Sequence, residues 1–187
     1  MKKYSLIKFA SLIILLMVFQ MSIAQTVNSP KTLTITMEID YDSWNRDKKD
    51  LWYDHITFSD NDSIKNQDNG KKGRSFKSKV KRKQKLIWKA QILDDGEKSK
   101  NKEVVLISVS RNPGNGKDFL LSEFWYDGKY DKKNAEYIVE GAIRDMAIPE
   151  YLEERYTISF AIHYLDDDEN VKFDIYTVDP IIRGHDN

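Results

Sequence analysis

Residues 156–178 place the strongest limit on what this chain can fold into. From residue 156 to residue 164, apolar and aromatic side chains alternate with small or polar ones, and the alternation resumes from residue 171 to residue 178. A period of two is typical of a β-strand with one buried face. A polar turn at residues 166–170 separates the two runs, so the stretch predicts an antiparallel hairpin. On this interpretation Val171, Phe173 and Ile175 form the half-buried face of the second strand.

The same alternation recurs along the chain and predicts an all-β domain without a convincing helix. Residues 32–41 are the clearest case, with five apolar side chains on one face. Residues 104–107 are continuously apolar, which suggests a strand buried on both faces. Asp179-Pro180 is expected to end the last strand, because proline gives no amide hydrogen to the ladder. The remaining strands are predicted at residues 55–59, 75–81, 85–93, 103–111, 119–126 and 136–144, with a polar turn at 127–134.

The expected strands, about nine in number, fit a single antiparallel β-sandwich of the immunoglobulin-like or jelly-roll-like kind, with a barrel as the second choice. The domain is predicted to span residues 32–183, followed by a tail at 184–187. The chain contains no cysteine. This excludes disulfides, thiolate metal sites and a cysteine nucleophile, so the core alone must hold the domain together.

The first 24 residues have the composition of a cleaved export signal. Three lysines precede an apolar stretch at residues 9–19, and Ser22 and Ala24 supply the small residues that precede a cleavage site. A membrane anchor is the alternative, but Gln20 interrupts the run before it reaches the roughly 20 residues that a span needs. We therefore expect a signal peptide at 1–24, a linker at 25–31, a mature chain with no membrane span, and a secreted or periplasmic location.

Residues 71–85, called the basic segment below, carry nine cations and no acid. The C-terminal residues 145–187 carry eleven acids and three basic residues, so charge is polarised along the chain. One hypothesis is an edge that binds an acidic polysaccharide or another polyanion of the cell envelope through Lys77, Lys79 and Lys81. Alternatively, the lysines protect an edge strand from pairing with other chains, or they pair with neighbouring acidic strands.

Several aromatic residues lie in or beside the predicted loops. Trp44, Trp52 and Trp125 are candidates for stacking on the faces of sugar rings. The alternative is that these rings cover the open end of the core.

No motif points to a metal, a cofactor or a catalytic centre. The turn Asp166-x-Asp168-x-Asn170 begins like a calcium loop, but Val171 stands where glycine is required and no glutamate closes the loop. The nucleophile elbow, the paired-histidine zinc motif and the phosphate-binding loop are all absent from the sequence. We therefore predict no enzyme, although two of the many acids could still form a glycosidase-type pair.

The order of strands resembles that of a known bacterial family. A basic strand leads into Leu86-Ile87-Trp88, an apolar strand follows at residues 104–107, then Tyr156-Thr-Ile-Ser-Phe, and finally Asp179-Pro180-Ile181. This order is similar to the inclusion-body (PixA/AidA-like) family of small β-sandwich proteins. The resemblance implies a sandwich fold and no established catalytic residues.

Three functions follow as hypotheses. The first is an exported, non-enzymatic module that binds an acidic or neutral polysaccharide, with no nucleic acid as partner. The second is a structural protein that associates with itself or with a partner through strand edges. The third is a glycan hydrolase with an unrecognised carboxylate pair. The sequence leaves the oligomeric state open.

Overall fold

The computed structural model describes residues 30–44, 53–62, 71–93, 101–112, 120–148, 152–166 and 168–185. The expected signal peptide, nearly all of the linker, Trp52 and the last two residues of the tail lie outside these ranges. Within the described ranges, no helix is long and apolar enough to cross a membrane.

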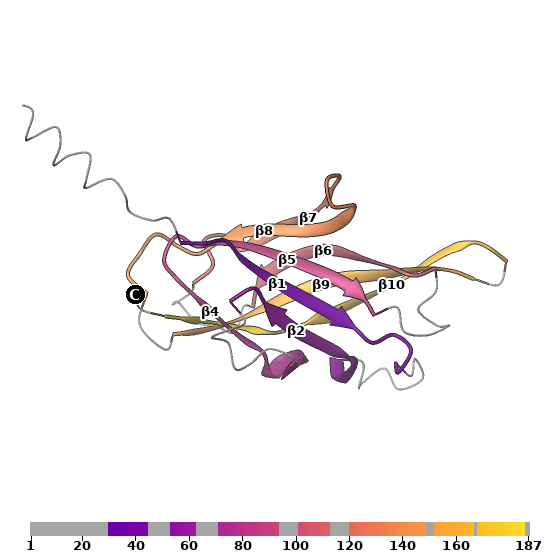
Figure 1. The fold of residues 1–187 in the computed structure, drawn as a ribbon, viewed down its shortest axis with the longest axis horizontal. Coiled ribbons are helices and arrows are strands. Elements are labelled where there is room, and N and C mark those ends of the chain that lie inside the picture. Colours follow the sequence, from indigo (N-terminus) through magenta and orange to yellow (C-terminus); the bar gives the residue numbers. More distant parts are fainter. Residues whose placement is uncertain are drawn as a thin grey trace, which may run out of the picture.

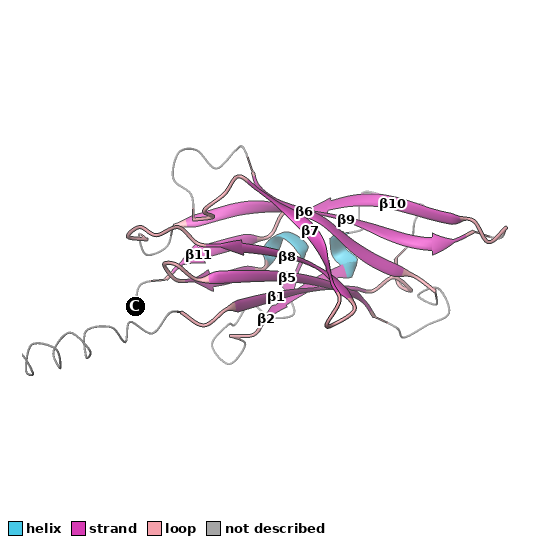
Figure 2. Ribbon diagram, turned by 90° about the horizontal axis from the view of Figure 1, so that it is seen from above, coloured by secondary structure: helices cyan, strands magenta, loops and turns pink. Residues whose placement is uncertain are grey.

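The described chain consists of strands joined by turns, and its longest axis runs along them (Figures 1 and 2). Short 3-10 turns at residues 53–55 and at η2 (Gly73–Ser75) interrupt the strands. The strands are β1 (Leu33–Ile39), β2 (Ile56–Asp60), β3 (Lys71–Lys72), β4 (Lys77–Val80), β5 (Lys85–Ile92), β6 (Glu103–Arg111), β7 (Trp125–Asp131), β8 (Glu136–Ala142), β9 (Glu153–Leu165), β10 (Val171–Val178) and β11 (Ile181–Gly184).

All of these strands belong to one sheet, so the prediction of a two-sheet sandwich is wrong. The order is β3-β2-β1-β5-β8-β7-β6-β9-β11-β4, and β10 pairs with β9. The sheet is continuous because the first part of β7 pairs with β6 and its second part pairs with β8. It is also not purely antiparallel, since β1 runs parallel to β5 and β11 runs parallel to β4.

Gly128 permits the crossing of β7 over β6. A Cβ atom at this position would lie 2.0 Å from the carbonyl oxygen of Leu106, so any side chain would force the strands apart. The ladder of β6 shifts register between Leu106 and Ser108 at the same place. This β-bulge leaves Ile107 38% exposed, so the prediction that residues 104–107 are buried on both faces is wrong. The prediction of a turn at residues 127–134 is wrong at its start, because β7 runs to Asp131.

The two ends of the sheet meet, which gives a nearly closed, barrel-like shape. β3 at one end and β4 at the other are joined directly by η2. The buried Ser78 hydroxyl on β4 hydrogen-bonds a carboxylate oxygen of Asp60 on β2 over 2.8 Å. The rings of Phe58 and Phe76 stack beside this bond, with centroids 5.3 Å apart.

The core lies inside the curled sheet and follows the predicted alternation. Every second residue of β1 is buried, and β9 buries Tyr156, Ile158 and Phe160 in the same way. Trp88 on β5 is fully buried, and Gly141 on β8 makes room for it, since a Cβ there would lie 2.7 Å from the indole ring. β10 ends at Val178, but a further strand, β11, follows Pro180 where the sequence predicted an end.

Candidate functional site

Three cations of the basic segment, Lys77, Arg82 and Lys83, pair with acids of the same chain. Lys77 on β4 donates to Glu153 at the start of β9 over 2.9 Å, and Arg183 on β11 donates to the same carboxylate. Burial raises the pKa of Glu153, but the hydrogen bonds from Lys77 and Arg183 outweigh it, so the pKa lies below its ordinary value. Lys79 is exposed and Lys81 is half-buried. Of the three lysines predicted to bind a polyanion, Lys77 is therefore engaged within the fold.

The turn after β4 repeats this pairing. Arg82 and Lys83 both contact the carboxylate of Asp145. Their hydrogen bonds, Lys83 first, hold the pKa of Asp145 below its usual range. The cations of this turn thus face an acid from the acidic C-terminal part, as the cross-strand alternative anticipated.

The predicted tryptophans lie in different surroundings. Trp44 is only 4% exposed, and its ring packs edge-on against Tyr41 and tilted against Tyr176, so it offers no face to a ligand. Trp125 on β7 is 51% exposed, and its indole N–H donates to Asp127 over 2.7 Å. Of the described tryptophans proposed for sugar stacking, only Trp125 is open to solvent.

The acidic turn uses its first carboxylate to hold its own backbone. One oxygen of Asp166 accepts hydrogen bonds from the backbone N–H groups of Asp168 and Asn170. The Asn170 bond is the largest cause of a lowered pKa at Asp166, and Lys172 contributes from 3.4 Å. Among the described residues, no group of three or more histidines and acids is placed to hold a metal ion.

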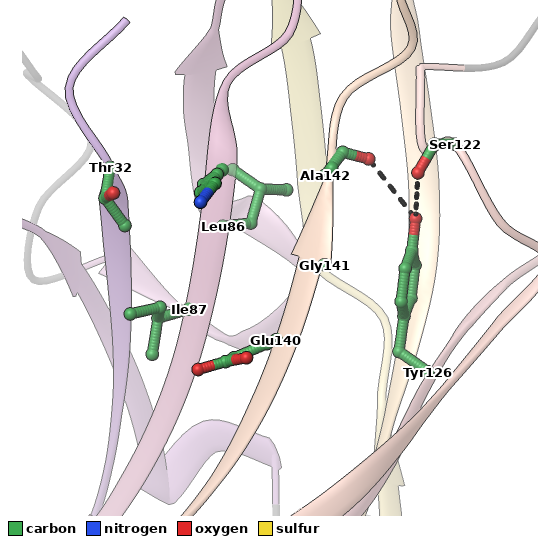
Figure 3. A pocket seen from close by; sticks show the side chains of 9 residues that line it. Thr32, Leu86, Ile87, Ser122, Tyr126, Glu140, Gly141 and Ala142 are labelled. Carbon is green, nitrogen blue, oxygen red and sulfur yellow. Dashed lines mark hydrogen bonds between the residues drawn. The ribbon is translucent and has the colours of Figure 1, made fainter. Parts of the chain in front are cut away.

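A shallow pocket of about 530 Å³ opens beside β5 and β8 (Figure 3). Glu140 is the one carboxylate among its lining residues, and it pairs with Lys129 over 2.6 Å. The Tyr126 hydroxyl is bonded to the Ser122 hydroxyl and the Ala142 carbonyl. Because retaining and inverting glycosidases need two facing carboxyl groups, this pocket gives the hydrolase hypothesis no support.

The hairpin of β9 and β10 carries an exposed apolar surface that the sequence did not predict. Val171, Phe173 and Ile175, called the β10 stripe below, are 67%, 60% and 61% exposed. Leu165, which lies opposite Val171 on β9, is 50% exposed. Figure 1 shows this hairpin reaching beyond the other labelled strands at one end of the molecule. The prediction that the stripe faces the interior is therefore wrong.

The other face of β10 explains the outward orientation of the stripe. The Tyr176 ring packs against Trp44 and Phe160, and Val178 is buried. Successive side chains of a strand alternate between its faces, so residues 172, 174, 176 and 178 share one face. Because Tyr176 and Val178 face the core, the residue between them and the β10 stripe lie on the opposite face of the strand, toward solvent.

The sheet offers no described cover for the outer edge of β10. Among the strands that the structure describes, β10 pairs with β9 alone. The stripe and this edge together form the candidate interaction site.

No protein-family model matches the chain, and no curated protein matches it. Among solved structures, the chain is similar to the crystal structure of an inclusion body protein (PixA) from Burkholderia cenocepacia. The TM-score is 0.60 at 10% sequence identity, and the match covers 86% of this chain and 99% of the other. The resemblance seen in the order of strands is thereby confirmed, and at this identity it shows a shared fold.

Proposed function

We propose that the protein is a non-enzymatic structural protein that associates with itself through the β9–β10 hairpin. The β10 stripe carries this proposal. Contiguous apolar surface on a soluble protein marks an interaction site or an aggregation risk, and an open apolar strand edge is a template for pairing with another chain. In the part of the chain that the structure describes, the stripe combines both features on one strand.

The solved structure of similar fold supports the same proposal, because its title describes an inclusion body protein. Inclusion bodies require many copies of a chain to associate. An exposed apolar edge at one end of an otherwise well-packed sheet is a means to such association.

Sedimentation of the purified protein over a wide range of concentrations tests this function. We expect the mass to rise with concentration, and we expect Phe173→Asp to weaken association by about 100-fold, because a charge would be placed against apolar surface. Phe124→Asp is the matched control, since Phe124 is 58% exposed but lies outside the hairpin. A wild-type protein that stays monomeric at all concentrations would overturn the proposed function.

Glycan binding at Trp125 is a second candidate, favoured by the exposed indole and by Phe124 close to it in the chain. Aromatic faces of this kind stack on sugar rings, and exposed Lys79 would add attraction for an acidic polysaccharide. Titration with neutral and acidic polysaccharides should show binding that Trp125→Ala abolishes. Equal binding by the wild type and Trp125→Ala would remove this site from consideration.

We also propose that the chain is exported to the periplasm or beyond and loses residues 1–24. The basic and apolar composition of that segment supports this proposal. Mass spectrometry of the protein recovered from cell fractions should find a chain that begins at Gln25. An intact Met1 in the cytoplasmic fraction would contradict it.

A further inference from the structure

We propose that the partner of β10 is β10 of a second copy, paired antiparallel about a two-fold axis through Phe173, so that Lys172 of each copy faces Asp174 of the other. This inference rests on the proposed self-association and gives it a register. It follows from the backbone direction of the outer edge and from the order of residues along the strand.

The hydrogen-bonding ladder shows which backbone groups are available. The Asp166 N–H donates to the Asn170 carbonyl over 3.0 Å, so these two residues form a hydrogen-bonded pair. The next pair along the ladder, Leu165 opposite Val171, is therefore a non-hydrogen-bonded pair. Bonded and non-bonded pairs alternate along an antiparallel ladder, so residues 172, 174 and 176 direct their N–H and C=O groups to β9. The corresponding groups of Val171, Phe173 and Ile175 therefore point away from β9, along the outer edge.

Two copies can pair in registers that oppose these outward residues to one another, and only the registers centred on residues 172, 173 and 174 bring at least two residues of each stripe opposite the other stripe. A register centred on Lys172 would oppose two lysines, and one centred on Asp174 would oppose two aspartates. Both bring like charges together at the closest points of the ladder, where side chains repel. The register centred on Phe173 instead opposes Lys172 to Asp174 twice, once on each side of the axis.

The apolar residues fit the same register. Val171 of one copy lies opposite Ile175 of the other, and the two Phe173 rings meet at the axis. The order of residues 171–175, which is apolar, basic, apolar, acidic, apolar, reads the same in both directions when signs are exchanged. A strand with this order is self-complementary about its centre, as a two-fold interface requires. The two β10 stripes then join into one apolar surface on the outer face of the enlarged sheet.

Charge reversal tests this register directly. Lys172→Asp opposes two carboxylates twice across the axis, and Asp174→Lys opposes two amines twice, so each variant alone should associate about tenfold or more weakly. An equimolar mixture of the two variants opposes opposite charges at both positions, so association should return to the wild-type level as a hetero-pair. Lys172→Gln controls for loss of the contact with Asp166, and Lys79→Asp on β4 controls for net charge.

Rescue in the mixture, seen by sedimentation with one variant labelled, would confirm the register. If the wild type and both single variants associate equally while Phe173→Asp does not, self-association stands and this register is wrong. If the single variants are folded by circular dichroism and weak, but the mixture is no stronger, the pairing is also wrong. A wild type that is monomeric at every concentration overturns the proposed function itself, and a different protein or the chain's own N-terminal segment then becomes the occupant of the stripe.

Discussion

β4 pairs with β11, and β10 pairs with β9, so both strands lie next to strands from the C-terminal part of the chain. The side chains that they carry differ. β4 carries lysines, and it is held between β11 and the closing contacts with β2. β10 carries three exposed apolar residues and pairs with β9 alone among the described strands. Lys77, which looked like part of a ligand surface, pairs with an acid of the same chain, whereas the residues of the β10 stripe, which looked like core, are exposed.

The difference shows that the residue types of a strand do not reveal what will cover it. Lys77 on β4 pairs with Glu153 of the same chain. Apolar alternation on β10 indicates that one face must be covered, but the cover can come from another molecule.

The largest loss of stability is expected from Glu154, which lies at the closed end of the sheet. Its side chain is fully buried, pairs with Arg111, and accepts the backbone N–H groups of Leu120 and Leu121. Glu154→Gln should lower the free energy of unfolding by about 3 kcal/mol, because the largely buried Arg111 loses the charge of its fully buried partner. Urea unfolding measures this, with Glu153→Gln, at a partly exposed neighbour, as the control expected to cost less than about 1 kcal/mol. Equal losses of stability in the two variants would contradict the view that the buried Glu154 contributes more to stability than Glu153.

The second prediction makes β10 resemble β4. Val171→Lys together with Ile175→Lys should weaken self-association by about 100-fold, because lysines on an edge oppose pairing. Both side chains are more than half exposed, so the free energy of unfolding of the monomer should change by less than about 0.5 kcal/mol. Sedimentation and urea unfolding on the same preparation separate the two effects. If the variant loses stability but still associates, the β10 stripe stabilises the monomer and is not the association surface.

The third prediction concerns the contact that closes the sheet. Ser78→Ala removes the buried hydrogen bond to Asp60 and should cost about 1–2 kcal/mol of unfolding free energy. Ser122→Ala is the control, since Ser122 is exposed and its bond to Tyr126 lies at the surface. Thermal unfolding compares them. No difference between these serine variants would mean that the Ser78–Asp60 contact does not stabilise the closure.

The smallest effect is the pH dependence of the ion pairs around β4. The pKa of Glu153 is lowered in the folded protein from 4.5, and that of Asp145 from 3.8. A carboxyl group whose pKa is lowered by folding stabilises the fold above its unfolded pKa, and this contribution is lost as pH falls through the folded value. Unfolding at pH 6 and at pH 3 should therefore show a loss at low pH that is smaller in Glu153→Gln. An identical loss in the variant would exclude Glu153 as a source.

The alternation of β1 and of the inner half of β9 was sufficient to predict these strands, because their apolar face is covered by the chain itself. The resemblance to the inclusion-body family was also visible in the order of strands. The number of sheets was not, since alternation reports that one face is buried and not how neighbouring strands connect. Only the three-dimensional structure shows that β7 pairs with both β6 and β8 and so joins the strands into one sheet.

The candidate site escaped prediction for a related reason. The orientation of β10 depends on Tyr176 meeting Trp44, a residue more than a hundred positions earlier in the chain. The pairing of Lys77 in the basic segment likewise depends on a distant acid, since Lys77 and Glu153 are 76 residues apart. The one local signal available was the position of Tyr176 and Val178 on the same face as Lys172 and Asp174, which conflicts with a buried stripe.

Amide hydrogen exchange of β10, followed by NMR at several protein concentrations, tests the central claim most directly. The amides of Lys172 and Asp174 bond to β9 and should be protected at every concentration. The amides of Val171, Phe173 and Ile175 point outward, and the account predicts that they exchange quickly in dilute solution and slowly in concentrated solution. Rapid exchange of these three amides at every concentration would contradict it.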